Sequence, residues 1–236
     1  MRNRSKEESA HMAILVTGGA GFIGSHLVGR LAGRGERIVV VDDFNDYYSP
    51  QLKRANAARI KQAGDVSIVE ADIRDAGAMR KVFDECGIES VVHLAGRAGV
   101  RPSVAAPLLY VDVNVGGTVV LLELAAARKV RNFVFASSSM VYGASREVPF
   151  REDAKCDTPA SPYGATKRAA EMMVYNCHFL YGLRAVCLRF FSVYGPRQRP
   201  DMAIHKFTKA IAAGKAFPFF GDGTAARDCT YIDDIV

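Results

Sequence analysis

The sequence predicts a doubly wound, parallel α/β sheet, on three observations. Short runs rich in valine and isoleucine, such as residues 38–41 and 66–69, alternate along the chain with segments of helical composition. Strands that are apolar throughout are typical of parallel sheets covered by helices on both faces. The first apolar run, residues 14–16, also leads through a glycine-rich turn into a further apolar segment, the order strand, turn, helix.

The glycines of that turn, Gly18, Gly21 and Gly24, can serve a nucleotide in three ways. They allow a tight turn out of the strand, a close approach of a pyrophosphate to the backbone, and close packing of the helix on the sheet. The free N–H groups at the start of a helix also favour a diphosphate. Taken alone, the three glycines would equally fit an ordinary turn, so the interpretation depends on the second apolar run of the chain.

This second run, residues 37–43, ends in two acids, and Asp42 lies 18 residues after Gly24. In dinucleotide-binding folds a carboxylate at this place accepts hydrogen bonds from the adenosine ribose, and its charge repels a 2′-phosphate. The alternative is a solvated acid at the end of a strand. Beside the glycine turn, Asp42 predicts NAD rather than NADP as the cofactor.

The rest of the chain continues the alternation. Helices are expected at residues 24–31, 52–60, 78–86, 115–129, 162–181 and 203–213, and further strands at 66–69, 91–96, 132–136, 184–190 and 217–220. We therefore expect a nucleotide-binding domain over residues 13–190 and part of a smaller substrate lobe over 191–236. Residues 1–12 are polar and without pattern, and are expected to form a disordered, tag-like leader.

A second group of polar residues follows the strand expected at 132–136. Ser137, Ser138 and Ser139 would lie at its carboxyl end, where open parallel sheets bind their ligands, although a serine cluster alone is usually a turn. Tyr163 and Lys167 are four residues apart on the next helix and so share one face. These residues predict a site that oxidises an alcohol.

The chemistry explains why such a site needs both residues. A tyrosine that takes a proton near pH 7 must lower its pKa by roughly 3 units, or about 4 kcal/mol. An ammonium group about 5 Å away contributes roughly 3.3 kcal/mol at an effective dielectric constant of 20. We expect Lys167 to activate Tyr163 in this way, a bound oxidised nicotinamide to add to the effect, and Ser138 to hold the substrate oxygen.

Composition excludes several other classes of protein. The 236 residues are 49% hydrophobic and carry a net charge of +6, but lysine and arginine are spread along the chain, which disfavours nucleic acid as a partner. No uninterrupted apolar run reaches the ~18 residues of a membrane span, and no signal peptide is evident, so a cytoplasmic protein is expected. The five cysteines and five histidines show no metal-binding or disulfide pattern.

Two further sets of residues are candidates for ligand contacts. The pair Asp72 and Ile73 could hydrogen-bond and pack against an adenine, although a plain turn is an equal alternative. Arg197, Arg199 and Arg227 could bind a substrate diphosphate or carboxylate, since arginine binds both groups bidentately, or could be solvated loop residues.

Together these motifs resemble the extended short-chain dehydrogenases/reductases of the NAD-dependent nucleotide-sugar epimerase and dehydratase group. The resemblance covers residues 12–236 and rests on TGGAGFIG at 17–24, on Ser138, Tyr163 and Lys167, on SVYGPR at 192–197, and on GDGT followed by RD at 221–228. It implies a Rossmann-type domain, bound NAD and a homodimer. The cofactor contacts that it implies are Gly18, Gly21, Phe22, Ile23, Gly24, Asp42, Asp43, Asn45, Asp72, Ile73, Leu94, Ala95, Gly96, Tyr163, Lys167 and Phe190. The implied substrate contacts are Arg101, Ser138, Ser139, Ser192, Arg199 and Arg227.

Within this group the residues at 41–48 and 189–195 look most like those of UDP-glucuronate 4-epimerases. UDP-galactose 4-epimerases usually have asparagine at the position of Ser192, where a small hydroxyl leaves room for a C6 carboxylate. A UDP-glucose/UDP-galactose 4-epimerase and a catalytically silent NAD-binding module stay open as alternatives.

Members of the group continue well past residues 231–234, so this chain is expected to be truncated. Met140 stands where related dehydratases and decarboxylases have a glutamate, so neither reaction is expected. The alternative is that Met140 faces the core and another residue supplies the base.

Overall fold

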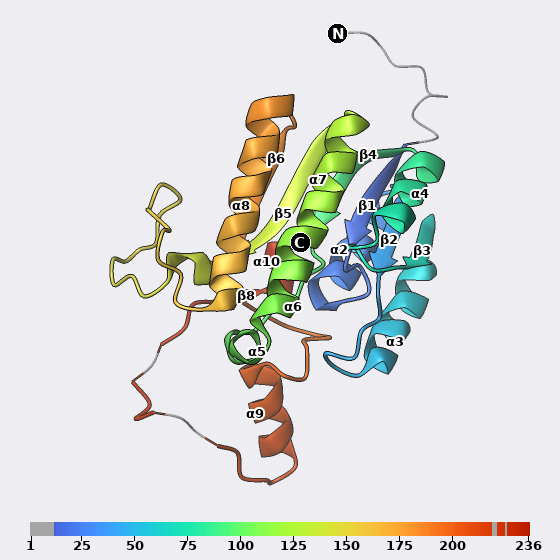
Figure 1. Cartoon of the computed structure of the whole chain (residues 1–236). Helices are drawn as coiled ribbons and strands as arrows, with labels where there is room; N and C mark the ends of the chain where they lie inside the picture. The colour runs from blue at the N-terminus through green and yellow to red at the C-terminus, as the bar shows by residue number, and fades with distance from the viewer. Residues whose placement is uncertain (1–11, 219–220, 225) are drawn as a thin grey trace.

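The computed structural model describes residues 12–218, 221–224 and 226–236, and most of the expected leader lies outside this part. Six parallel strands form the main sheet, in the order β3-β2-β1-β4-β5-β6 (Figure 1). The strands are β1 (Ala13–Thr17), β2 (Ile38–Asp42), β3 (Val66–Glu70), β4 (Ile88–His93), β5 (Asn132–Ser138) and β6 (Ala185–Phe190). The order reverses between β1 and β4, and such a switch point is where ligands bind in open α/β sheets.

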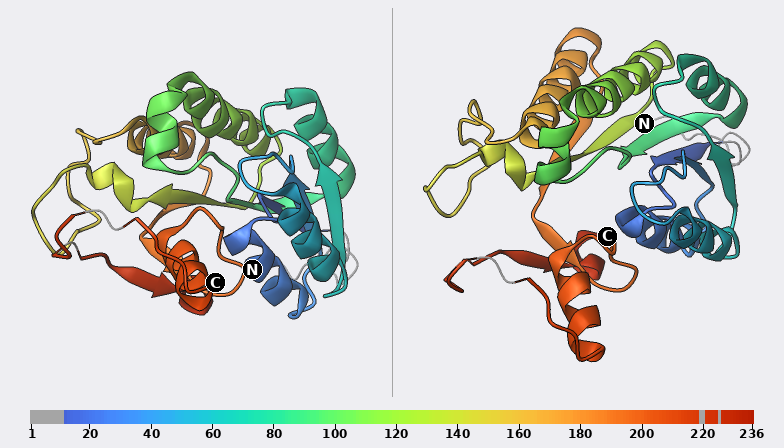
Figure 2. Two further views of the ribbon diagram at one scale, coloured as in Figure 1. Left: turned by 90° about the horizontal axis from the view of Figure 1, so that it is seen from below. Right: turned by 60° about the horizontal axis from the view of Figure 1, so that its bottom comes forward.

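Helices cover both faces of this sheet, as Figure 2 shows in its right-hand view. On one face lie α2 (Phe22–Ala32) and α3 (Pro50–Lys61), and on the other α4 (Ala76–Cys86), α7 (Gly117–Ala127) and α8 (Pro162–Tyr181). Successive side chains of a strand point to opposite faces of the sheet. Val16 therefore packs with α2 and α3, whereas Leu15 packs with the other three helices. The predicted doubly wound sheet is confirmed.

The helix before β5 begins earlier than the sequence predicts. After α5 (Val100–Ala105), the chain runs through α6 (Pro107–Val111) and a π-helical turn at Asp112–Gly116 into α7. The whole stretch, Pro107–Ala127, is long and apolar enough to cross a membrane by length and composition. Half of it is buried inside the protein, however, and the core helices of soluble proteins have the same character.

The last part of the chain forms a second, small unit of secondary structure. Strands β7 (Ser192–Tyr194) and β8 (Cys229–Tyr231) pair in parallel, and α9 (Ala203–Ala212) and α10 (Ile232–Ile235) belong to the same part (Figures 1 and 2). Phe22 of α2 packs with Val193 and Ile232, which joins this part to the main sheet. Of the strand expected at 217–220, residues 217–218 form no strand and 219–220 lie outside the described residues.

Candidate active site

A pocket of about 290 Å³ opens at the carboxyl ends of the strands of the main sheet. All of the predicted cofactor contacts line it: Gly18, Gly21, Phe22, Ile23, Gly24, Asp42, Asp43, Asn45, Asp72, Ile73, Leu94, Ala95, Gly96, Tyr163, Lys167 and Phe190. Ser138 and Arg199 lie in the same lining. Residues from the whole length of the chain therefore meet in one cavity.

The glycine turn forms a cradle that larger residues would block. Gly18 has a φ of +69°, and a Cβ atom there would lie 2.8 Å from the backbone nitrogen of Ala95. A Cβ atom at Gly24 would lie 2.2 Å from the carbonyl oxygen of Gly18. Only glycine fits both places, and the bare backbone together with the N-terminus of α2 suits a dinucleotide pyrophosphate. The residues present therefore fit the predicted cofactor.

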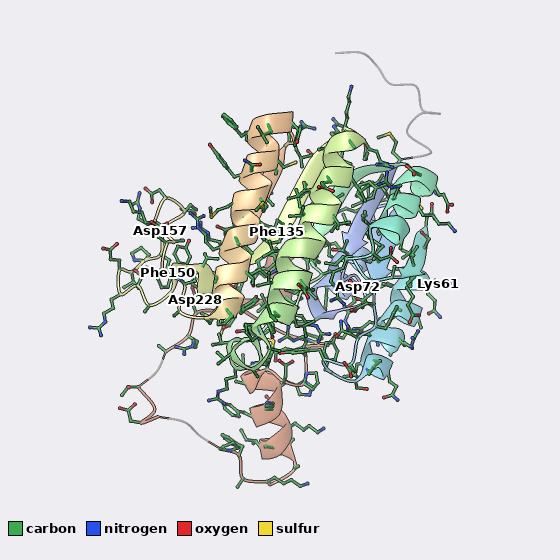
Figure 3. The ribbon with its side chains drawn as sticks, in the orientation of Figure 1. Lys61, Asp72, Phe135, Phe150, Asp157 and Asp228 are labelled. Carbon is green, nitrogen blue, oxygen red and sulfur yellow. The ribbon has the colours of Figure 1, made fainter. Side chains whose placement is uncertain are left out.

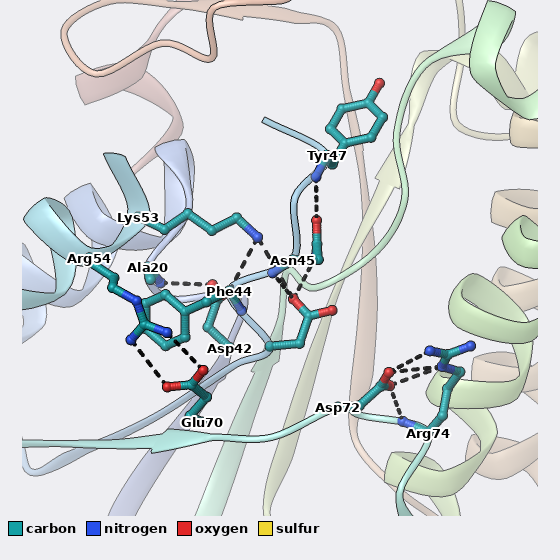
Figure 4. Close-up of polar contacts among 11 residues, drawn as sticks. Ala20, Asp42, Phe44, Asn45, Tyr47, Lys53, Arg54, Glu70, Asp72 and Arg74 are labelled. Atoms are coloured by element: carbon teal, nitrogen blue, oxygen red, sulfur yellow. Dashed lines mark hydrogen bonds and ion pairs between the residues drawn. The ribbon is translucent and has the colours of Figure 1, made fainter. Parts of the chain in front are cut away.

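At the end of β2, Asp42 is buried and its carboxylate is fixed from three sides (Figure 4). Oδ2 accepts a hydrogen bond from the Ala20 backbone N–H at 3.2 Å, and Oδ1 accepts one from Phe44 at 3.0 Å. Lys53 Nζ lies 3.4 Å from Asp42 Oδ1 and 3.7 Å from Asp43 Oδ1. Burial raises the pKa of Asp42, and the ammonium of Lys53 opposes that rise.

Ser138, Tyr163 and Lys167 come together because β5 ends beside the first turns of α8. Lys167 is buried, and its Nζ donates a 2.8 Å hydrogen bond to the carbonyl oxygen of Ala136. Burial lowers the pKa of Lys167 to about 8. Burial also raises the pKa of Tyr163, and a hydrogen bond with Ser138 opposes this. In the chain alone the burial of the phenol therefore sets the direction of the Tyr163 pKa shift, and the activation by Lys167 together with a bound nicotinamide stays a prediction.

Behind the pocket, a buried histidine links β1 and β4 to the helix layer. Thr118 Oγ1 donates to the Asn114 carbonyl at 2.6 Å, so it accepts from His93 Nε2 at 2.9 Å. His93 Nδ1 then accepts from Thr17 Oγ1, 2.7 Å away. Burial lowers the pKa of His93 to about 3, so the ring is neutral and serves as a connector.

A buried ion cluster holds the end of β5 against β6 and α8. Glu171, one turn after Lys167, accepts two 3.0 Å hydrogen bonds from Arg189 and one of 2.5 Å from Ser137. Arg168 donates a further bond to the same carboxylate at 3.0 Å. Because Ser137 precedes Ser138, this cluster fixes the strand end that carries the serine hydroxyl.

The predicted substrate contacts divide into two groups. Ser138 and Arg199 line the pocket, and Arg199 is held by Asp201 through hydrogen bonds of 3.0 and 2.8 Å. Four others lie outside its lining and stay predictions: Arg101 on α5, Ser139 after β5, Ser192 on β7 and Arg227 in the segment before β8. Met140 is also outside the lining, and its side chain is 38% exposed.

Other lining residues were not among the predicted contacts, although the sequence places Ser137 at the same strand end as Ser138. They are Val41, Tyr47, Tyr48, Lys53, Ala71, Arg97, Ala98, Val113, Ala136, Ser137, Phe191, Val193 and Met202. Figure 3 draws the side chains on the ribbon and labels Asp72, one of the lining residues. The available signal in the sequence was the position of Tyr47 and Tyr48 in the segment between the acid pair and the next helix. Within the described ranges no cluster of three or more histidine, cysteine or acidic residues could hold a metal ion.

Comparison with known proteins agrees with this geometry. Residues 14–236 match the family model described as "NAD dependent epimerase/dehydratase family". UDP-glucuronate 4-epimerase 3 of Arabidopsis thaliana is 48% identical over 228 residues, which cover 95% of this chain and 53% of that protein. UDP-glucuronate 4-epimerase of Thermodesulfobacterium geofontis is 47% identical over 221 residues, covering 94% of this chain and 68% of that protein. The chain thus spans about half the length of the Arabidopsis relatives.

Among solved structures, UDP-glucuronic acid 4-epimerase from Bacillus cereus, in complex with UDP-glucuronic acid and NAD, has a TM-score of 0.88 and 39% identity. The match covers 95% of this chain and 70% of that one. UDP-glucose 4-epimerase from Thermotoga maritima, with UDP-glucose, has a TM-score of 0.85 and 36% identity, covering 95% and 71%. With the family match, the sheet order and the pocket all in agreement, the chain belongs to the NAD dependent epimerase/dehydratase family.

Proposed function

We propose that the complete protein is an NAD-dependent 4-epimerase of a UDP-hexuronate, interconverting UDP-glucuronate and UDP-galacturonate through a transient 4-keto sugar. The observation that carries this proposal is that the residues suited to the cofactor and those suited to alcohol oxidation line the same pocket. It joins the glycine cradle and Asp42, which suit a dinucleotide, to the hydroxyls of Ser138 and Tyr163 and the ammonium of Lys167, which suit alcohol oxidation.

The residues divide the work of the reaction. NAD, when bound, would accept a hydride from C4 of the sugar and return it to the opposite face. Tyr163 takes the proton of the 4-hydroxyl group and later gives it back, while Ser138 hydrogen-bonds the same oxygen. Since burial raises the pKa of Tyr163, its phenol is protonated in the ligand-free protein. Catalysis therefore needs the positive charges of Lys167 and of the bound nicotinamide together.

The choice of a uronate is supported by the relatives and by one cation in the pocket. The similar proteins from Arabidopsis and Thermodesulfobacterium are named UDP-glucuronate 4-epimerases. Arg199 lines the pocket, its Nε and Nη2 bind Asp201, and its Nη1, which takes no part in those two bonds, could donate to a C6 carboxylate. A UDP-glucose/UDP-galactose 4-epimerase is the second candidate, because the Thermotoga structure is also similar.

The test uses the complete protein with NAD and either UDP-glucuronate or UDP-glucose. Efficient formation of UDP-galacturonate, with slow or no conversion of UDP-glucose, is expected. The Tyr163→Phe variant should still bind NAD but lose at least about 100-fold in turnover, because a general base contributes about 10²–10⁴-fold. No interconversion at C4 of either sugar would contradict the proposal, as would unchanged turnover in Tyr163→Phe.

We also propose that the protein forms a homodimer through the exposed face of α8 and the neighbouring α5 and α6. Met172, Tyr175 and Phe179 follow helical spacing on α8 and are 58–73% exposed, and Leu108 on α6 is 78% exposed. An apolar stripe of this kind favours burial in an interface. A Tyr175→Lys, Phe179→Glu double variant should sediment as a monomer where the wild type is a dimer. A monomeric wild type would contradict this proposal.

A further inference from the structure

We propose that residues 45–48, here called the strap, close over the cofactor pocket and keep NAD bound between turnovers, with Tyr47 as the residue that fastens them. The inference rests on the proposed function, because it assumes that the cofactor in this pocket is NAD. It adds a role for Tyr47 and Tyr48, which the catalytic steps leave unused. Both residues line the pocket.

Two side chains, those of Asp43 and Asn45, stabilise the backbone at the start of the strap. Asp43 Oδ1 accepts a hydrogen bond from the backbone N–H of Asn45 at 3.1 Å, and Asn45 Oδ1 accepts one from Tyr47 at 3.2 Å (Figure 4). Such bonds between a side chain and the backbone two residues later stabilise turns. The path of the strap is therefore set from the end of β2, beside the two acids that suit the ribose.

The far end of the strap is fastened on the opposite side of the sheet's switch point. The hydroxyl group of Tyr47 donates a 2.8 Å hydrogen bond to the carbonyl oxygen of Ala98, in the segment that follows β4. Tyr110 on α6 donates to the same oxygen at 2.7 Å. A Cβ atom at Gly99 would lie 2.7 Å from the Tyr47 oxygen, so a glycine is needed for this approach. The strap thus runs from β2 to the segment after β4.

Two guanidinium groups also contact the Tyr47 ring. Arg97 Cζ lies 5.8 Å from the ring centroid, and Arg199 Cζ lies 5.4 Å from it. Both arginines line the pocket, and Asp201 holds Arg199 in place. These cation–π contacts connect the strap to the loop after β7, so that three separate segments meet over the pocket at one ring.

Tyr48 lies where a bound dinucleotide would pass. Its hydroxyl oxygen is 4.0 Å from a Cβ atom built at Gly21, in the glycine cradle, and its ring lies 5.4 Å from Lys53 Nζ. Tyr48 therefore spans the distance between the pyrophosphate cradle and the acids of β2. Burial raises the pKa of Tyr48 to about 12, so a neutral ring covers this part of the pocket.

The consequence is kinetic. A dinucleotide on the cradle lies beneath the strap, and it can leave only after the contacts of Tyr47 have broken. A 4-epimerase regenerates its NAD in every cycle and has no need to exchange it. Loss of the Tyr47 hydrogen bond should raise the rate of NAD release about fivefold. Loss of each cation–π contact should raise that rate about two- to fivefold. Loss of the whole side chain should therefore speed NAD release about tenfold or more.

The test measures the release of NAD from the complete, NAD-loaded protein, with excess 1,N6-etheno-NAD as a fluorescent replacement. Tyr47→Ala should release NAD at least tenfold faster than the wild type, and Tyr47→Phe several-fold faster, because it keeps the ring but loses the hydroxyl group. Leu52→Ala is the matched control: Leu52 is 47% exposed, belongs to the next helix and does not line the pocket, so release should be unchanged.

The possible outcomes separate the strap from the proposed function. If the wild type retains NAD and Tyr47→Ala releases it at the rate of Leu52→Ala, the strap proposal is wrong and the function stands. If the wild type holds no NAD, both are wrong. Tyr47→Phe removes only the hydroxyl group that donates to Ala98 and should fold like the wild type. It therefore tests the proposal even if Tyr47→Ala folds poorly.

Discussion

Lys167 meets two opposing physical demands at the scale of a single residue. In the proposed reaction its ammonium group must be charged to favour the phenolate of Tyr163, yet its burial disfavours the charge and lowers its pKa to about 8. One hydrogen bond to the Ala136 carbonyl offsets part of the cost. The residue therefore lowers the stability of the fold for the sake of the site, a conflict common at catalytic positions.

The first prediction comes from this conflict. Lys167→Met should abolish turnover but raise the free energy of unfolding by up to about 3 kcal/mol at pH 7, the equivalent of a shift from 10.5 to about 8. Between pH 8 and 10.5 the unfolded state binds more protons than the folded state, so wild-type stability gains with rising pH relative to the variant. Urea unfolding of both proteins at pH 7 and 9.5 checks this. A variant less stable than the wild type at pH 7 would contradict it.

A second prediction concerns cofactor choice. The carboxylate of Asp42 should exclude the 2′-phosphate of NADP, but Lys53 neutralises part of the acid pair's charge. We expect the wild type to bind NAD at least tenfold more tightly than NADP. Lys53→Met should increase the preference for NAD over NADP, because the acids lose their counter-charge. Asp42→Asn should decrease that preference, because the repelling carboxylate is lost. Fluorescence titrations of both cofactors measure the ratios, and similar affinity of the wild type for NADP would show that Asp42 does not discriminate.

At the scale of elements, the π-helical turn at Asp112–Gly116 connects the pocket wall to α8. π-Turns inside helices often mark functional sites. The turn includes Asn114, whose Oδ1 accepts from the Arg97 N–H at 2.7 Å and whose Nδ2 donates to the Arg97 carbonyl at 2.9 Å. The same Nδ2 donates to Thr166 Oγ1 on α8 at 3.1 Å. One buried side chain thus aligns the segment after β4 with the helix that carries Tyr163 and Lys167.

The third prediction tests this alignment. Asn114→Ala removes two part-buried hydrogen bonds to the backbone of Arg97 and one to Thr166, and should lower the free energy of unfolding by about 2 kcal/mol, because each such bond contributes about 0.5–1.5 kcal/mol. Turnover should fall as well. Asp112→Asn, an exposed change on the same turn, is the control and should change stability by less than about 0.5 kcal/mol. Equal stabilities of the two variants would contradict the role of Asn114.

The same scale shows what could be predicted from sequence. Apolar runs such as residues 38–41 predict buried strands, and the glycines at 18, 21 and 24 predict a turn that can hold a pyrophosphate. Both predictions succeed because these signals are local in the sequence. The start of the α6–α7 helix was missed because Pro102 and Pro107 interrupt the pattern, and β7 and β8 are too short to produce one. Tyr47 was missed because its partners, Ala98 and Arg199, come from distant parts of the chain. The burial that raises the pKa of Tyr163 could not be predicted, because residue spacing carries no information on desolvation.

At the scale of the whole molecule, the pocket lies where the main sheet meets the C-terminal part of the chain. Phe191, Val193, Arg199 and Met202 line it from that part, while the glycine cradle and the acid pair line it from the first strands. Ser192 and Arg227 belong to the C-terminal part but lie outside the lining. The part of the pocket that suits the cofactor is therefore built by the six-stranded sheet, and the later residues line another part of its wall.

The most direct test of the central claim follows the hydrogen at C4. The complete protein with NAD would be incubated with UDP-glucuronate that carries deuterium at C4, and the products analysed by mass spectrometry and NMR. We predict UDP-galacturonate of unchanged mass with deuterium still at C4, because the same hydride leaves and returns. We also predict no loss of CO₂, as expected from methionine at position 140, where related decarboxylases have a glutamate. Loss of the deuterium to solvent, or UDP-xylose as the main product, would contradict the account.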